Sequence, residues 1–381
     1  MKPKDSLVTL YTKKESEQFI QNQRDAKNNL VASMLQNDIS RFATNFKTKS
    51  IALTAGNHSL IGTVNNKDYK NSPMCSPYNL FCIYPKQRLQ FLKNKWLRNF
   101  LNIVTSIFQI SFKMAKFNRV IQLNNKPCDA IVHPKLSTAH LEQSIEKLIS
   151  RFPKHAILFP RLDQTSNPEL FTSLVKTGFK MVPTRPVHLF HPDHHYMKRS
   201  HTKRDFALLR KSEYTLVSHD EITSVDLARI HELYQMLFID KHTKENPNLT
   251  LDYFEKCHAN GWYKFFAFRN PEGVIDAFLT YETQDNQMAC GPLGYDTSKP
   301  KETGLYRLLF AKSLEIASDN HYIFNFGGGN EVFKINRGSL REVGYTAVYC
   351  KHLPLYRRIP WIFLSEVGRK ITVKIFEKNL F

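Results

Sequence analysis

The sequence predicts an α/β protein made of two similar halves. At 381 residues the chain is long for a single hydrophobic core, which favours two domains. Between residues 119 and 191, stretches typical of strands alternate with stretches typical of helices, and this alternation indicates an α/β unit. The same style of alternation returns after residue 214. No residue-level repeat is visible, so the order of elements is what repeats.

Residues 1–75 are polar and patchily apolar, and they form an uncertain N-terminal region that is partly loop. Within this region, residues 51–56 and 59–64 predict a short hairpin. From Tyr78 onward, apolar residues recur at spacings of three and four, which predicts helix. The most apolar window, residues 100–112, is shorter than the about 20 residues that a bilayer-spanning helix needs. We therefore expect a buried helix there.

Residues 76–197 form the predicted first half. Pro153 stops the helix expected over residues 141–149, and Gly178 is a good ending signal for the helix expected over residues 168–179. A histidine-rich turn and a basic run follow, and we place the boundary between the halves in this segment. The expected strands cover residues 119–123, 156–162 and 186–191, and the expected helices cover residues 141–149 and 168–179.

Residues 198–361 form the predicted second half, and residues 362–381 form a basic amphipathic tail. The tail either packs on the body with its lysines outward or makes a peripheral contact with a membrane surface, and we favour the first interpretation. In the second half, the expected strands cover residues 214–218, 263–269, 274–282, 288–295 and 322–326, and the expected helices cover residues 224–238, 251–260 and 304–319.

The formal net charge is +20, with a sequence pI near 9.6. Such a charge creates a positive field over much of the surface. The field suits anionic partners, which include nucleic acid, phosphorylated cofactors and an anionic membrane face. Charge alone does not choose among these classes.

The six cysteines are scattered, and no Cys-x-x-Cys pair occurs. This pattern predicts reduced, buried thiols and a cytoplasmic protein. The N-terminal segment has no apolar stretch long enough for a signal peptide, and no transmembrane segment is predicted. The histidines at positions 191, 194 and 195 favour a solvated turn over a metal site, so no metal is expected.

Residues 291–317 contain a candidate pyrophosphate cradle. A strand ends near Tyr295, and a loop then leads to Gly304, where a long helix is expected to begin. A helix N-terminus presents N–H groups and a partial positive charge, and glycine lets a phosphate approach the backbone. An ordinary strand-to-helix turn is the alternative. The candidate cofactor-binding residues are Lys301, Gly304, Leu305, Tyr306 and Arg307.

Three consecutive glycines follow the expected strand at residues 322–326. Glycine permits positive φ and lets another group come close to the backbone. Lys334 and Arg337 lie three residues apart, so they project from one face of a helical turn toward a possible anion, with a solvated basic face as the alternative. The candidate catalytic residues here are Asp296, Glu331 and Lys334, the two carboxylates as general bases, and the candidate substrate-binding residues are Gly327, Gly328 and Arg337.

The segment after residue 238 is a candidate cover for a site. A predicted helix runs into Asp240-Lys241-His242, and Asn246 precedes Pro247, which favours an extended turn. Loops of this kind commonly cover the sites of α/β enzymes, although a plain connector has the same composition. Asp240, Lys241 and Asn246 therefore complete the candidate substrate-binding residues.

Several of these motifs resemble a bacterial family of GNAT-type N-acetyltransferases. The resemblance rests on GYDTSKPKETGLYRLL, FNFGGGNEVFKINRG and AVYCKHLPLYRR, and it extends from about Tyr78 to Trp361. The second motif is also similar to the peptidoglycan Fem aminoacyltransferases, which carry a strand ending in Phe-Gly-Gly and then a Phe-Lys pair, here Phe333-Lys334. The resemblance implies tandem GNAT-like (acyl-CoA N-acyltransferase) domains with mixed central sheets.

The resemblance also implies an N-acyltransferase that moves an acyl group from acetyl-CoA, or another acyl-CoA, to an amine acceptor by direct attack. GNAT enzymes hold the pyrophosphate on an Arg/Gln-x-x-Gly-x-Gly/Ala loop, and residues 301–306 lie at the matching place. Here Lys301 replaces the Arg or Gln, and Tyr306 replaces a small residue and would crowd the phosphates.

An aminoacyl-tRNA-dependent, Fem-like transferase is therefore one alternative, since the +20 charge and residues 198–211 suit a tRNA backbone. A non-catalytic adaptor that kept the fold and lost the donor site is the other.

Overall fold

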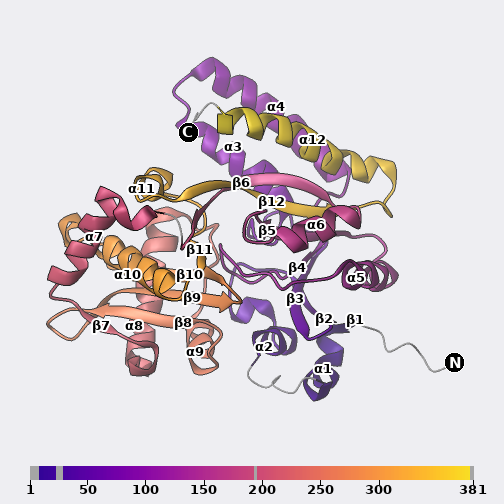
Figure 1. The fold of residues 1–381 in the computed structure, drawn as a ribbon. Helices are drawn as coiled ribbons and strands as arrows, with labels where there is room; N and C mark the ends of the chain where they lie inside the picture. The colour runs from indigo at the N-terminus through magenta and orange to yellow at the C-terminus, as the bar shows by residue number, and fades with distance from the viewer. Residues whose placement is uncertain (1–7, 23–28, 193–194, 378–381) are drawn as a thin grey trace.

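A single mixed sheet of twelve strands runs through the molecule, in the order β1-β2-β3-β4-β5-β12-β6-β11-β10-β9-β8-β7 (Figure 1). The structure is a computed structural model, and it describes residues 8–22, 29–192 and 195–377. The strand order is nearly symmetric about the sheet centre, with elements of the N-terminal half on one side and elements of the C-terminal half on the other.

The first repeat begins with a strand, two helices and three further antiparallel strands, and it then crosses over through a helix to a parallel strand. An insertion between its third and fourth strands adds two helices, α3 (Tyr84–Arg88) and α4 (Lys95–Met114). Its elements are β1 (Val8–Thr12), α1 (Ser16–Asn22), α2 (Leu30–Gln36), β2 (Lys49–Ala55), β3 (His58–Asn65), β4 (Val120–Leu123), α5 (Thr138–Arg151), β5 (Ala156–Leu162), α6 (Pro168–Lys176) and β6 (Lys180–Phe190).

The second repeat follows the same order after a linking helix, α7 (Ser200–Lys211). Its parallel pair is β10 with β11, joined through α10. A final helix, α12 (Leu355–Glu377), packs against β6. The elements are β7 (Thr215–Val217), α8 (Ser224–Tyr234), the π-helix η8 (Gln235–His242), α9 (Leu251–Ala259), β8 (Lys264–Arg269), β9 (Ile275–Gln284), β10 (Gln287–Tyr295), α10 (Leu305–Asp319), β11 (Ile323–Asn325), α11 (Glu331–Asn336) and β12 (Leu340–Tyr349).

The two repeats exchange their last strands at the centre of the sheet. Strand β12 of the second repeat pairs with β5 of the first, β6 of the first pairs with β11 of the second, and β6 and β12 pair with each other. All three pairings are antiparallel. The predicted tandem α/β fold is thus confirmed, and its two central sheets are joined into one. The predicted domain boundaries after residues 75, 197 and 361 stay predictions.

Hydrophobic side chains join the repeats away from the sheet centre as well. One core cluster combines residues of α1 and α2 with residues of α8, α9 and β8. Phe42 contacts the rings of Tyr253 and Trp262 at centroid distances of 6.4 and 6.3 Å. Arg41 also donates to the Asp252 carboxylate at 2.6 Å. The halves therefore share their hydrophobic core and cover their sheet together.

The prediction of a buried helix over residues 100–112 is wrong. Helix α4 does form there, but Phe112 is its one buried residue among those described. Trp96, Phe100 and Ile107 are among several large apolar side chains that α4 exposes. The apolar spacing was read correctly as helical, but spacing alone does not say which face of a helix meets the core.

All six cysteines are free and buried. Within the described ranges, none of the helices is both long enough and apolar enough to cross a membrane. Among the same residues, no group of histidine, cysteine, aspartate or glutamate side chains has the arrangement of a metal site.

Candidate functional site

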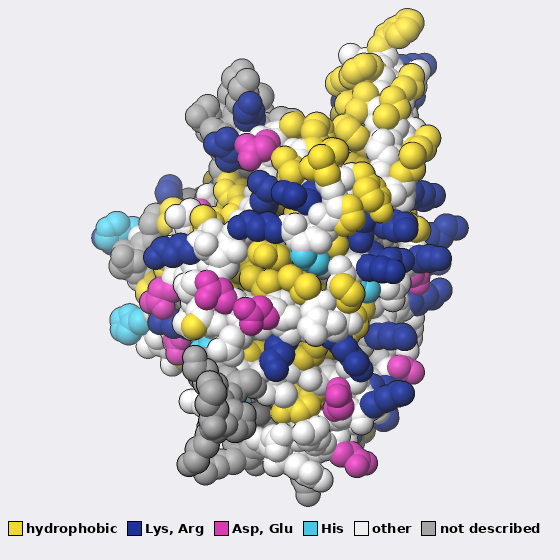
Figure 2. Space-filling model, turned by 90° about the vertical axis from the view of Figure 1, so that its right-hand side faces the viewer, with side chains coloured by type: hydrophobic (Ala, Val, Ile, Leu, Met, Phe, Trp, Pro, Cys, Tyr) yellow, Lys and Arg dark blue, Asp and Glu magenta, His cyan; other side chains and the backbone are white. Residues whose placement is uncertain are grey.

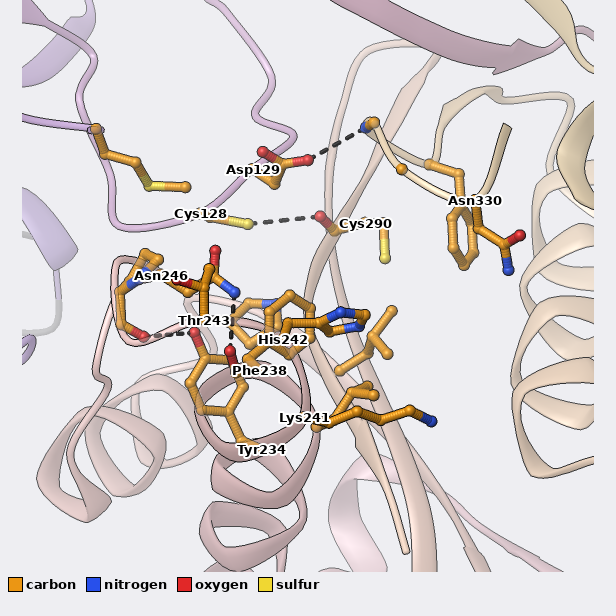
Figure 3. A pocket seen from close by; sticks show the side chains of 18 of the residues that line it. Cys128, Asp129, Tyr234, Phe238, Lys241, His242, Thr243, Asn246, Cys290 and Asn330 are labelled. Atoms are coloured by element: carbon orange, nitrogen blue, oxygen red, sulfur yellow. Dashed lines mark hydrogen bonds between the residues drawn. The ribbon is translucent and has the colours of Figure 1, made fainter. Parts of the chain in front are cut away.

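A cavity of about 770 Å³ lies between the two repeats, at the point where β10 and β11 diverge. Its volume lies within the range typical of pockets for small molecules and cofactors. The first repeat contributes residues from α3, from the loop after β4 and from β6, and the second contributes η8, β10 and the glycine loop after β11 (Figure 3). The site is thus built by both halves.

The divergence of β10 and β11 creates the inner end of the cavity. The two strands pair in parallel over three residues each, ending at Ala289 and Asn325. Beyond that point β10 has an irregular register with β9 between Cys290 and Leu293. The other chain turns away through Gly327, whose φ of 72° is a left-handed conformation that glycine adopts readily. Main-chain groups of both strands therefore border the opening.

Lys334 holds the glycine loop in place. Its side chain is 1% exposed, and Nζ donates to the carbonyl oxygens of Phe326, Gly327 and Gly328 at 3.3, 3.1 and 2.7 Å. Burial lowers the pKa of Lys334 to about 7. The lysine also lines the cavity, so a buried amino group with a perturbed pKa lies at the divergence point.

Asp129 reaches the same loop from the first repeat. One carboxylate oxygen accepts a hydrogen bond from the Gly328 N–H at 3.2 Å, and the carboxylate also forms an ion pair with Arg185 of β6. Nearby, the Cys128 thiol donates to the carbonyl of Cys290 at 3.5 Å (Figure 3). Among the described residues that line the cavity, Asp129 is the one carboxylate. It is therefore the one acidic side chain among these lining residues.

The π-helix η8 and the loop after it form another wall of the cavity. The rings of Tyr234 and Phe238 stack with centroids 5.0 Å apart, and Asn246 Nδ2 donates to the Phe238 carbonyl at 2.9 Å. Lys241 Nζ donates to the Tyr295 hydroxyl at 3.1 Å. Burial, together with Lys241, lowers the pKa of His242 below its ordinary value. This wall offers aromatic faces, an amide and a neutral imidazole to a ligand.

The structure brings five of the sequence-predicted site residues together around this cavity. They are Lys241, Asn246, Tyr306, Gly328 and Lys334.

Gly327 does not line the cavity, and its carbonyl accepts a hydrogen bond from Lys334. Asp240 is exposed and does not line the cavity. Tyr306 contacts Phe326 and Phe333 at centroid distances of 6.1 and 4.8 Å, so its ring borders the divergence of the strands.

Of the predicted pyrophosphate cradle, Tyr306 lines the cavity, whereas Lys301, Gly304, Leu305 and Arg307 do not. Gly304 has a left-handed φ of 69°, and a Cβ placed on it would come within 2.7 Å of the Leu208 side chain of α7. Arg307 Nε donates to Asp205 at 2.6 Å, and Arg337 Nε donates to the same carboxylate at 2.5 Å. Asp205 thus pairs with both arginines that were candidates for binding an anion, and its single negative charge offsets one of their two positive charges. Lys301 is exposed. Neither arginine lines the cavity.

The two predicted general bases belong to ion pairs elsewhere. Asp296 accepts from Arg229 at 2.7 Å and from Ser298 at 2.5 Å. Burial alone would raise its pKa, but these hydrogen bonds and the Arg229 charge lower it overall. Glu331 forms an ion pair with Arg341 at 2.5 Å. Neither carboxylate lines the cavity.

Sequence reasoning missed several lining residues, which include Cys128, Asp129, Arg185, Tyr234, Phe238 and Cys290. Asp129 lies just after the turn that ends the strand at β4, and Cys290 lies within β10. If the two parallel strand pairs had been recognised as equivalent, the residues after each strand would have been candidates. Arg185 carries no such local signal, since it reaches the site only through the strand exchange.

No protein-family model and no curated protein matches the sequence. Several solved structures are similar in fold. The C-terminal domain of a putative lysylphosphatidylglycerol synthetase from Agrobacterium fabrum is 13% identical over 59% of this chain and 76% of that chain, with a TM-score of 0.45. FemX is 12% identical over 57% of this chain and 78% of that chain, with a TM-score of 0.46.

A GCN5-related N-acetyltransferase from Kribbella flavida is 12% identical over 62% of this chain and 84% of that chain, with a TM-score of 0.32. The chain itself folds as two α/β repeats that share one mixed sheet, which agrees with the two-half α/β architecture that the sequence predicts.

Proposed function

We propose that this protein is an N-acyltransferase that passes an acyl group from a thioester donor, acyl-CoA, to an amine bound beside Asp129. The observation that carries the proposal is the divergence of β10 and β11 into a cavity of about 770 Å³. Diverging strands expose main-chain donors and acceptors along a slot. An extended acyl-pantetheine arm can bind such a slot through backbone hydrogen bonds.

The chemical step needs few side chains. The amine enters as an ammonium ion next to the Asp129 carboxylate and loses one proton through it to water. The neutral nitrogen attacks the acyl carbonyl carbon, a C–N bond forms and the C–S bond breaks. The second proton that leaves nitrogen ends on the released thiolate. Main-chain N–H groups at the divergence polarise the carbonyl, and Lys334 positions the glycine loop at the edge of this opening.

Direct attack is favoured over a covalent enzyme intermediate. Cys128 and Cys290 are the lining residues with a thiol that could accept an acyl group. Burial raises the pKa of Cys128 to about 12 and also raises the pKa of Cys290. Only a thiolate is an effective nucleophile, so both side chains stay unreactive at neutral pH.

Aminoacyl-tRNA is the second candidate donor, and one observation favours it. Helix α7 exposes a row of basic side chains that suits a phosphate backbone, while Arg307 is already paired with Asp205. The exposed basic residues of α7 and the segment before it are Lys198, Arg199, Lys203, Arg204, Arg210 and Lys211.

The two donors are distinguished by a thermal-shift titration of the whole chain with acetyl-CoA, CoA and bulk tRNA. A ligand that binds the folded state raises the melting temperature by mass action. A shift with CoA species supports the first donor, and a shift with tRNA that falls steeply with salt supports the second. No shift with either ligand at millimolar concentration would overturn the transferase proposal and leave the adaptor interpretation.

Activity is then tested by thiol release from acetyl-CoA with a panel of primary amines. Asp129→Asn keeps an oxygen that can accept from Gly328 N–H but removes the charge, so we expect about a hundredfold loss of turnover. Glu255→Gln on the exposed face of α9 is the matched control and should behave as wild type. Equal turnover of Asp129→Asn and wild type would remove Asp129 from the mechanism.

A further inference from the structure

Helix α4 presents a continuous apolar row to solvent. Its members recur at spacings of three and four residues, which places them on one face of the helix. Trp96 near the N-terminal end is 88% exposed, and Met114 at the C-terminal end is 73% exposed. The α4 row consists of Trp96, Phe100, Ile103, Ile107, Ile110 and Met114.

The other face of α4 already has its partners. Phe112 packs on Phe117 at a centroid distance of 4.5 Å, and Phe108 packs on Phe363 of α12 at 5.3 Å. The helix is therefore anchored with the α4 row facing away from the protein. Single exposed apolar side chains are ordinary, but six aligned over a 20-residue helix form a patch of the kind that marks an interaction surface.

In the sequence that surrounds the α4 row, all the acidic and basic side chains are lysines and arginines. Residues 69–128 contain no aspartate or glutamate. Lys95 and Lys113 lie on α4 about a quarter turn from the row, and both are exposed. Lys93 and Lys116 extend the positive charge beyond the two helix ends. Long lysine side chains beside an apolar stripe can reach anionic headgroups while the stripe enters the acyl region.

Helix α12 continues the same surface. It lies beside α4 at the top of the molecule (Figure 1), and Leu355, Tyr356 and Ile359 are exposed apolar residues of its first turns. Figure 2 shows hydrophobic side chains gathered over the upper part of this face, with lysine and arginine side chains around them. The apolar area thus spans two neighbouring helices.

We propose that the α4 row docks the protein on an anionic lipid surface, with α4 lying in the plane of the interface. Apolar insertion and lysine attraction to anionic headgroups act together there. Trp96 at the end of the row suits the headgroup region, where tryptophan is enriched. A second copy of the chain is a poorer occupant, because it would bring two basic flanks of a +20 protein together. The inference stands independently of the proposed function.

Vesicle co-sedimentation of the full chain tests the proposal. Wild type should bind vesicles of phosphatidylglycerol and phosphatidylcholine, and should bind vesicles of phosphatidylcholine alone at least about tenfold more weakly. Ile103→Asp/Ile107→Asp should abolish binding. Val225→Asp, at a 78% exposed apolar position on α8, is the matched control and should bind as wild type.

The charge contribution needs a second pair of variants. Lys93→Gln/Lys95→Gln should weaken vesicle binding by about thirtyfold, since each of the two lysines near an anionic surface adds about 1 kcal/mol. Lys256→Gln/Lys264→Gln removes the same charge from exposed positions of α9 and β8 and should have a smaller effect. Thermal unfolding confirms that all variants fold.

Two results would overturn the proposal. One is binding of Ile103→Asp/Ile107→Asp to anionic vesicles as tightly as wild type. The other is a wild-type dimer in analytical ultracentrifugation that this double variant converts to a monomer, which would assign the α4 row to a second copy.

Discussion

The two repeats differ most at the point where their parallel strands separate. The last paired residues there are Leu158 in β5 and Asn325 in β11. After them, the first repeat continues as Phe159-Pro160-Arg161 and the second as Phe326-Gly327-Gly328. Directly after the last paired residue, the first repeat therefore has bulky residues and the second repeat has glycines.

In the first repeat, Arg161 closes the divergence. It has a left-handed φ of 58°, and its guanidinium donates to the Asn124 carbonyl at 3.4 Å and to Asn125 Oδ1 at 2.8 Å. The buried His133 ring lies 3.3 Å from the Arg161 carbonyl. Side chains thus connect the chain segments that follow β4 and β5. Gly327 and Gly328 have no side chains, so they cannot make such a connection in the second repeat.

In the second repeat, the polar contact comes from behind the loop, where Lys334 bonds the glycine carbonyls. The space in front stays open and forms part of the cavity. The comparison teaches that one or two residues after the last paired position decide whether the divergence of a parallel strand pair is bridged by side chains or open to a cavity.

The largest effect is expected when the second repeat is made to look like the first. Gly328→Arg places a long side chain at the mouth of the divergence, where a Cβ would already lie 3.2 Å from Arg185. We expect the rate of acyl transfer to fall by at least about a hundredfold, which corresponds to an increase of about 3 kcal/mol in the activation barrier. We expect the ligand-induced thermal shift to fall as well. Thr172→Arg on the exposed face of α6 is the control. Full activity of Gly328→Arg would show that the open divergence is not the site.

Removing the support of the glycine loop should cost stability. Lys334→Met leaves three carbonyl groups without their donor, and we expect a loss of about 2 kcal/mol in the free energy of unfolding. Urea unfolding measures this loss, with Lys301→Met at an exposed position as the control. A loss no larger than that of the control would mean that the loop holds its shape without the lysine.

The buried bases of the two repeats predict different pH windows. Burial lowers the pKa of His133 to about 3, so the unfolded chain binds more protons between pH 6.5 and about 3, and stability falls as pH drops through that range. Lys334 has a pKa of about 7, and burial of its charged form lowers the free energy of unfolding. This loss of stability is full below pH 7 and disappears as pH rises toward 10.5.

Unfolding free energies across pH check both signs. The difference between wild type and His133→Gln should change on the acid side, by about 1–2 kcal/mol. The difference between wild type and Lys334→Met should change on the alkaline side. Parallel pH curves for wild type and a variant would contradict the assigned protonation of that residue.

The smallest effect is expected when the first repeat is made to look like the second. Arg161→Gly removes two hydrogen bonds but also relieves a left-handed φ in a non-glycine residue, and these contributions oppose each other. We expect the free energy of unfolding to change by no more than about 1 kcal/mol and the acyl-transfer rate to stay unchanged. A large fall in activity would mean that the first divergence also takes part in the reaction.

Local sequence signals were enough to predict much of the fold. The hairpin over residues 51–64 and the strand, helix and strand of β10, α10 and β11 follow from alternation, periodicity and glycine punctuation. The strand exchange could not be predicted this way, because it depends on pairings between residues more than 100 positions apart.

The residues of the candidate site also divide into those that a local sequence signal indicates and those that reach the site from distant parts of the chain. Gly328 and Lys334 were predicted because a glycine run after a strand is a local signal. Asp129 and Arg185 were not, because they reach the loop from the other repeat. The arginines at 307 and 337 were predicted as anion ligands, and no local pattern shows that both donate to the carboxylate of Asp205.

The exchanged strands have a consequence for how the protein is made. During synthesis β6 emerges long before its two neighbours, β11 and β12, exist. Until β11 and β12 are synthesised, the N-terminal half therefore has β5 and β6 without these partners, and such open strand edges can pair wrongly. Completion of the sheet depends on a strand that ends only at Tyr349, so a chain truncated before that strand lacks the piece that joins β5 to β6.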